Sequence, residues 1–142
     1  MSNIKKYAVE ETSTLHLRDA NDELLYADGK DGNPDKSKPM EVVLYGPGSA
    51  RYSKAQAASS NKMIDRLKKK GKTDQSAEEK ATETAEFLAA VTKNFNNLSY
   101  DELQGEALSR AVYSDTLLGF IVSQVNDHLG NWSNFTKAST TK

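Results

Sequence analysis

Apolar and polar residues alternate in the first part of the chain and follow a helical period in the second, with the change near residue 46. Leu15 and Leu17 lie between polar neighbours, which is the period of two expected of a half-buried strand. Residues 19–22 have turn chemistry, and residues 24–26 then predict the returning strand. Residues 40–45 predict a third strand.

The segment 28–39 reads DGKDGNPDKSKP, with no apolar residue, and therefore predicts a mobile loop. Three oxygen-bearing side chains match the first three ligand positions of an EF-hand calcium loop: Asp31, Asn33 and Asp35. The match ends there, because Lys36 stands where the motif requires glycine and Val42 where it requires a bidentate glutamate. We interpret the segment as a flexible acidic loop without a metal.

The residues 46–49, Gly-Pro-Gly-Ser, separate the strands from the first helix. They have the outline of a phosphate-binding loop, but Pro47 lacks an amide hydrogen and no lysine follows until Lys54, so the P-loop pattern fails. We interpret them as a strand-to-helix connector, with glycine where φ is unusual, proline for stiffness and Ser49 as the helix cap.

Four helices are expected after the connector. The first covers residues 50–70 and ends before Gly71. Its apolar stripe is thin and consists of Ala57, Ser60, Met63, Ile64 and Leu67. Capping boxes at 76–79 and 99–102 open the second and third helices. The second helix is expected to bury a face made up of Ala77, Ala81, Ala85, Leu88 and Val91, with Phe95 as its outermost candidate.

The third helix is short and runs to about Val112, and the fourth runs from about Asp115 to His128. The apolar stripe of the fourth helix consists of Leu118, Ile121, Val122, Val125 and Leu129. Phe120 lies roughly opposite this stripe, and Leu117 lies between the two faces. A helix that is apolar nearly all round is either buried centrally or presents a second face to a partner. Trp132 and Phe135, just beyond it, either fold back onto the core or serve as exposed anchors.

Three strands followed by about four helices, without strand–helix alternation, predict an α+β fold: an N-terminal three-stranded antiparallel β segment and then a bundle of about four α-helices. The 142 residues fit a single domain, with strands over 13–46, a helical part over 49–129 and a flexible C-terminal segment over 136–142. No stretch has the apolar length of a signal peptide or of a membrane-spanning helix, so we expect a cytoplasmic protein without membrane contact.

Candidate catalytic groups are few. The chain has no cysteine, which excludes disulfides, thiolate metal sites and cysteine nucleophiles. His16 and His128 are its two histidines, and neither has a cluster of acids or histidines at ligand spacing. We therefore expect neither an enzyme nor a cofactor.

The net charge is −1, but the charges are unevenly distributed. Residues 51–72 carry eight basic side chains and one acid, and residues 74–106 carry eight acids and two basic side chains. These segments are expected to pair, within the chain or between copies of it. The run 66–72, RLKKKGK, is a candidate nucleic-acid contact, but lysines at a helix C-terminus also offset the helix dipole, and Tyr52 is the one aromatic residue of the basic segment. We favour a solvated helix end.

Four short segments carry a resemblance to a known family: LYGPGS at 44–49, FNN at 95–97, VYSD at 112–115 and NWSNF at 131–135. Together with the sequence between them, from about Met40 to Phe135, they resemble tail assembly chaperones of long-tailed bacteriophages and prophages. The segment LHLRDANDELLYADG agrees with a short β-hairpin before this region. The resemblance is one of overall pattern, because no segment is a catalytic signature.

The resemblance implies a non-enzymatic protein that binds the tape-measure protein, keeps it soluble and helps tail tube subunits to assemble around it. It also implies a place in the cytoplasm of the bacterial host and absence from the mature virion. Our hypothesis places the partner surface on four apolar side chains with a basic rim: Leu117, Phe120, Trp132 and Phe135, with Arg66, Lys68, Lys69 and Lys70. A homo-oligomer held by the basic and acidic helices is a second hypothesis.

Two other classes remain open. A structural tail protein or head–tail neck protein would have the same composition but would stay with the virion. A small nucleic-acid-binding protein would use the run 66–72 to contact phosphates, and its affinity would fall steeply with salt.

Overall fold

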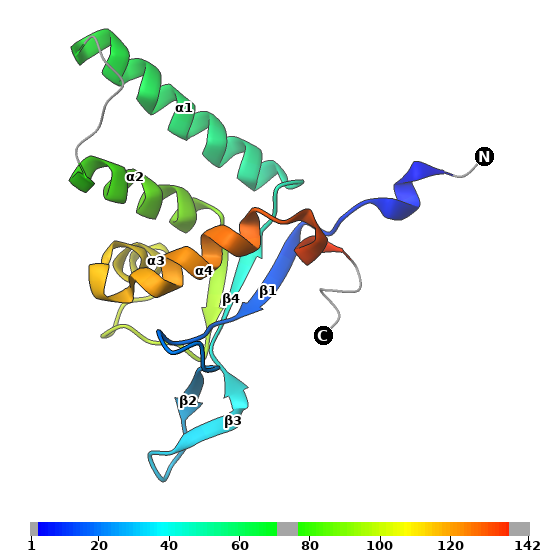
Figure 1. Cartoon of the computed structure of the whole chain (residues 1–142), viewed down its shortest axis with the longest axis vertical. Helices are drawn as coiled ribbons and strands as arrows, with labels where there is room; N and C mark the ends of the chain where they lie inside the picture. The colour runs from blue at the N-terminus through cyan, green and yellow to red at the C-terminus, as the bar shows by residue number, and fades with distance from the viewer. Residues whose placement is uncertain (1–2, 71–76, 137–142) are drawn as a thin grey trace.

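The computed structural model describes residues 3–70 and 77–136 of the chain. Its central element is a three-stranded antiparallel sheet in the order β1 (Thr12–His16), β4 (Glu41–Tyr45) and β5 (Thr92–Asn96). The sheet encloses the core together with three helices: α2 (Ala77–Ala90), α3 (Gly105–Ser114) and α4 (Gly119–Leu129). Helix α1 (Ala50–Lys70) extends away from this body (Figure 1).

Alternate side chains of the sheet point into the core. Leu15, Val42 and Phe95 lie opposite one another across the three strands and pack in the core. Thr14 and Asn94, on the opposite face, are exposed. This division into an apolar and a polar face is usual for an antiparallel sheet that is covered on one side. The largest fully buried side chains are Phe135, Leu17, Leu44, Leu88, Val42, Val91, Val112 and Val125.

The prediction of a mixed α and β fold with a three-stranded antiparallel sheet is confirmed, but the order of the elements is not. The third strand of the sheet is β5, which lies inside the part that we predicted as helical. Helix α2 ends at Ala90, and the Thr92 hydroxyl donates a hydrogen bond to the Leu88 carbonyl at 2.7 Å, which satisfies a carbonyl at the helix end. Strand β5 then pairs with the free edge of β4 and supplies partners for its backbone groups.

We predicted a loop over residues 28–39, but the structure has a β-hairpin there. Strand β2 (Tyr26–Asp28) pairs with β3 (Pro34–Pro39) in a separate two-stranded sheet that projects from the body (Figure 1). Polar side chains hold its turns: the Asp31 carboxylate accepts hydrogen bonds from the backbone amide and the side-chain amide of Asn33. Gly32 at the tip has φ of 81°, a conformation that glycine adopts without strain.

Two of the carboxylates that match calcium ligands in the sequence accept hydrogen bonds from their own turns: Asp31 from Asn33 and Asp35 from Ser37. The hydrogen bonds from Asn33 lower the pKa of Asp31, and those from Ser37 lower the pKa of Asp35. Within the described residues, no group of three or more histidine, aspartate or glutamate side chains is placed to hold a metal ion.

Helix α1 has the bounds that the sequence predicts, whereas α2 and α3 differ from prediction. The residues of α2 that are buried are Ala85, Leu88 and Ala89, and Ala77 and Ala81 are exposed. The residues 71–76, with the predicted cap Ser76, lie outside the described residues.

Helix α3 begins at Gly105 and not at the predicted capping box 99–102. Asp101 (φ 54°) and Gly105 (φ 61°) adopt left-handed conformations that interrupt a helix there.

The last helix has the predicted buried stripe, with Ile121, Val125 and Leu129 in the core. A short 3₁₀ turn, η2 (Thr116–Leu118), precedes it and is capped by the carboxylate of Asp115, which accepts from the Leu117 amide at 3.0 Å. A second 3₁₀ turn, η3 (Trp132–Phe135), follows it and returns Phe135 to the core. Of the predicted flexible segment 136–142, residues 137–142 lie outside the described residues.

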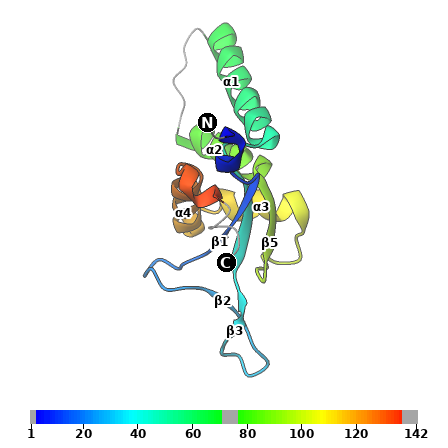
Figure 2. The ribbon, with the colours of Figure 1, turned by 90° about the vertical axis from the view of Figure 1, so that its right-hand side faces the viewer.

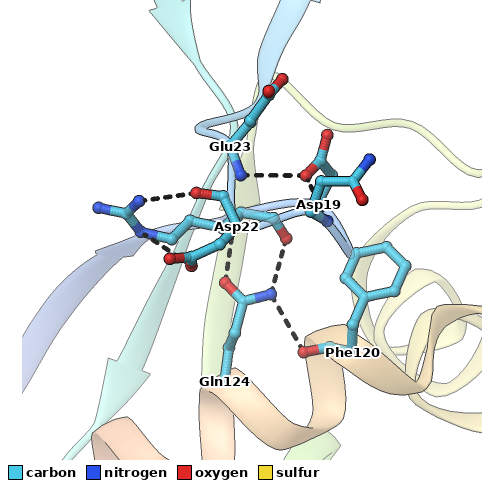
Figure 3. Close-up of polar contacts among 7 residues, drawn as sticks. Asp19, Asp22, Glu23, Phe120 and Gln124 are labelled. Atoms are coloured by element: carbon cyan, nitrogen blue, oxygen red, sulfur yellow. Dashed lines mark hydrogen bonds and ion pairs between the residues drawn. The ribbon is translucent and has the colours of Figure 1, made fainter.

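The side chain of Gln124 joins α4 to the end of the sheet (Figure 3). Its amide oxygen accepts from the Arg18 backbone amide, and its amide nitrogen donates to the Arg18 carbonyl, both at 2.7 Å. The amide nitrogen also donates to the carbonyl of Phe120 at 3.0 Å. One glutamine therefore ties α4 to the backbone just after β1.

Candidate binding surface on helix α1

The connector 46–49 sets the start of α1. The Ser49 hydroxyl accepts from the Tyr52 amide at 3.2 Å and donates to the Gly46 carbonyl at 2.7 Å, which confirms Ser49 as the cap. Neither glycine of the connector has a positive φ. Gly46 is required for a different reason, because a Cβ atom there would lie 2.4 Å from Cδ2 of Phe135.

Helix α1 is poorly covered by the rest of the protein. It spans about 32 Å, and Figures 1 and 2 show it rising from the body with its far end beyond α2. Among its described side chains, Ala55 is buried, Tyr52 and Arg66 are half-buried and the others are exposed. Most of the helix surface is therefore available to a partner.

Ion pairs hold α1 to α2. Arg66 pairs with Glu83, and Lys62 pairs with Glu86. The Arg66 side chain is 14% exposed and the Glu83 side chain 23%, so this pair is shielded from water more than a surface pair. The basic and acidic segments therefore pair within the chain, as one of our two alternatives predicted.

The apolar stripe of α1 is on the outside. Met63 is 45% exposed, and Ile64 and Leu67 are each 49% exposed. The sequence placed these three residues in one thin apolar stripe, and the structure leaves that stripe exposed. The reason is geometric: at about 100° per residue, the paired side chains Lys62 and Arg66 lie to one side of the stripe, and they turn the basic face of the helix toward α2.

An open groove of about 620 Å³ runs beside this stripe, between α1, α2 and α4. Met63 belongs to both the stripe and the groove, and Phe87 of α2 contributes the largest apolar side chain on the opposite wall. The groove is lined by Gln56, Ser59, Ser60, Met63, Lys80, Glu83, Thr84, Phe87 and Asn126. Met63 thus joins the stripe to a concave region in which Phe87 is the other apolar side chain and the remaining lining is polar.

The four apolar residues that we predicted as the partner surface do not lie together. Leu117 is 87% exposed before the start of α4, whereas Trp132 is 56% exposed beyond its other end. Phe120 is half-buried, and its ring points toward the turn at 19–23 (Figure 3). Phe135 is fully buried and is therefore a core residue, not an exposed anchor.

The predicted basic rim is divided as well. Arg66 is engaged by Glu83. Lys68 and Lys69 are exposed at the far end of α1 and have no ion-pair partner within the described part of the chain. The side chain of Lys70 and all of Lys72 lie outside what the structure describes.

The two histidines have structural contacts. His16 Nε2 lies 2.8 Å from the Leu25 carbonyl oxygen. His128 Nε2 lies 3.0 Å from the Ser13 hydroxyl, and its ring meets the edge of Phe135. Burial lowers the pKa of His128, so the neutral form is favoured despite its position at a helix C-terminus.

This shift predicts a loss of stability in mild acid. An unfolded histidine takes up a proton near pH 6.5, whereas folded His128 does so only at lower pH. The folded protein is therefore expected to have its full stability above pH 6.5 and to lose it as the pH falls toward the folded pKa, by at most about 1.4 kcal/mol per pH unit. Urea unfolding between pH 5 and 8 measures this slope.

His128→Gln should flatten the slope, since glutamine does not titrate. His16→Gln is the control, because it leaves His128 in place and should keep that part of the slope. An equal loss of stability in acid for His128→Gln and the unmodified protein would refute the assignment.

The length and apolarity of the helices also bear on function. Across the described residues, no helix combines the length and apolarity needed to span a bilayer. Sequence reasoning missed the α1 surface because it placed the partner surface around the last helix. The signal that could have revealed it is that a helix of 21 residues contains only three large aliphatic side chains, Met63, Ile64 and Leu67. No protein-family model, no curated protein and no solved structure matches the chain.

Proposed function

We propose that this protein is a non-enzymatic phage tail assembly chaperone that binds the tape-measure protein, keeps it soluble and assists assembly of the tail tube. The observation that carries the proposal is the exposed apolar stripe on a helix that stands away from the body. A partner that would aggregate alone needs such a surface, because its own apolar face must be covered. The resemblance over residues 40–135 supplies the identity of that partner.

The mode of binding that we propose is a helix in a groove. An amphipathic segment of the tape-measure protein lays its apolar face along α1 and the neighbouring groove, and contacts Met63, Leu67 and Phe87. This surface replaces the one proposed from the sequence around Leu117, Phe120, Trp132 and Phe135. The protein acts in the cytoplasm of the bacterial host and leaves before the virion matures.

Co-expression with the tape-measure protein of the same phage tests the proposal. The tape-measure protein is expected to be insoluble alone, and soluble and recovered with this chain when the two are made together. Mass spectrometry of purified virions should not find this chain. Abundant chain in virions, with no effect on the solubility of the tape-measure protein, would instead support a structural tail or neck protein.

The ion pairs of α1 argue against the nucleic-acid-binding alternative. Of the basic residues at the far end of the helix, Lys62 and Arg66 are directed to carboxylates of α2. Lys68 and Lys69 remain available among the described side chains, and two lysines give only weak, salt-sensitive contact with phosphates.

A further inference from the structure

Three adjacent side chains form the exposed apolar part of α1, and we call Met63, Ile64 and Leu67 the α1 strip. At about 100° per residue, the strip covers roughly 100° of the helix circumference. This is the width with which an amphipathic helix commonly packs on another element. It is narrow for a membrane-surface helix, and it contains none of the aromatic residues common in such helices.

The helix that carries the strip is basic. Helix α1 carries seven basic side chains and one acid, Asp65. Lys68 lies one turn after Ile64 and flanks the strip. Lys69 lies on the opposite side of the helix, where it lines the same pocket as Glu78, Glu79 and Glu83 of α2. Lys68 has no ion-pair partner among the residues described, so it can pair with a carboxylate of another molecule.

We propose that the α1 strip docks an amphipathic helix of a partner protein whose apolar face is flanked by acidic residues. This rests on the proposed function in that the tape-measure protein would supply the helix, and it adds the chemistry by which the segment is chosen. Leu67 and Met63 supply the apolar contact. Lys68, beside the strip, selects for carboxylates and against basic helices, because like charges repel at close range.

A second copy of this chain fits the strip less well. Two α1 helices laid side by side would bring two basic surfaces together. The acids of α2 lie on a helix without an exposed large apolar residue, because Leu88 is buried and Phe87 is half-buried. No described helix of this chain combines an exposed apolar strip with flanking acids, which is what α1 requires.

Two designed helical peptides test the selectivity directly. They share one apolar face and differ in their flanking residues, which are glutamates in one peptide and lysines in the other. Fluorescence anisotropy with the full-length protein at low salt is expected to show at least tenfold tighter binding of the glutamate peptide. Lys68→Glu should reverse the preference.

The apolar contact has its own variant and control. Leu67→Asp is expected to weaken binding of the glutamate peptide at least tenfold, and circular dichroism should show an unchanged fold because Leu67 is half exposed. Leu117→Asp introduces the same charge at another exposed leucine, far from the strip, and should bind like the unmodified protein.

Several results would overturn the inference. Equal affinity for the two peptides would show that the strip does not select acidic helices. Binding unaffected by Leu67→Asp would show that the strip is not the docking site. A dimer seen by sedimentation and lost in Leu67→Asp would assign the strip to a second copy. Binding to phosphatidylglycerol vesicles that Leu67→Asp abolishes would assign it to a membrane surface.

Co-expression with the tape-measure protein separates this inference from the proposed function. If the unmodified chain and Leu67→Asp both keep the tape-measure protein soluble, the function stands and the strip is not its docking site. If the unmodified chain fails while the peptide preference holds, the strip binds acidic helices and the proposed function is wrong.

Discussion

Replacing Phe135 by alanine is expected to lower the free energy of unfolding by about 3–5 kcal/mol. The side chain is fully buried, its ring lies against Gly46, and it meets the ring of His128 edge-on. Alanine would leave a cavity in a region whose backbone is fixed on both sides, since the Phe135 carbonyl also accepts from the Glu10 amide at 2.7 Å. Equilibrium unfolding in urea measures the loss.

Leu117→Ala is the matched control for this prediction. It removes an apolar side chain of similar character that is 87% exposed, so the change should stay within about 0.5 kcal/mol. Equal effects of Phe135→Ala and Leu117→Ala would mean that Phe135 is not a core residue.

Gly46→Ala is expected to destabilise the protein by about 2–3 kcal/mol. The new Cβ would lie within 2.4–2.8 Å of three ring carbons of Phe135, and neither the ring nor the strand end can move without disturbing the core. Gly119→Ala is the control, because a Cβ there would meet no other part of the protein within 4 Å beyond its own helix backbone and chain neighbours, and it should be neutral or slightly stabilising. Thermal or urea unfolding of both variants gives the comparison.

A double-mutant cycle identifies the contact responsible. In the Phe135→Leu background the smaller side chain leaves room, so Gly46→Ala should cost at least about 1 kcal/mol less than in the unmodified protein. Strict additivity would contradict the assignment of the steric conflict to Phe135.

The elements that the sequence predicted well are those whose own residues determine them. Helix α1 starts at a serine cap and contains no glycine or proline, and strand β4 is a short apolar run, so local chemistry fixed both. The stripe of α4 was also predictable, because Ile121, Val125 and Leu129 recur at the helical period and are buried together.

The elements that were mispredicted depend on distant partners. Strand β5 reads TKNFN and becomes a strand because β4 offers a free edge. The exposure of the α1 strip depends on acids of α2, which decide the face that α1 turns inward. Phe135 is buried because glycine at position 46 leaves space for a ring, a relation between residues 89 positions apart that no local pattern contains.

The position of Phe135 has a consequence for synthesis of the protein on the ribosome. β1 and Phe135 come from opposite ends of the described chain, and both are required to close the core. A nascent chain therefore holds an incomplete core until nearly its whole length has been made, because the last part of that core arrives with residue 135. Helix α1 and its ion-pair partner α2 are synthesised well before residue 135, so the apolar strip leaves the ribosome while the core is still incomplete.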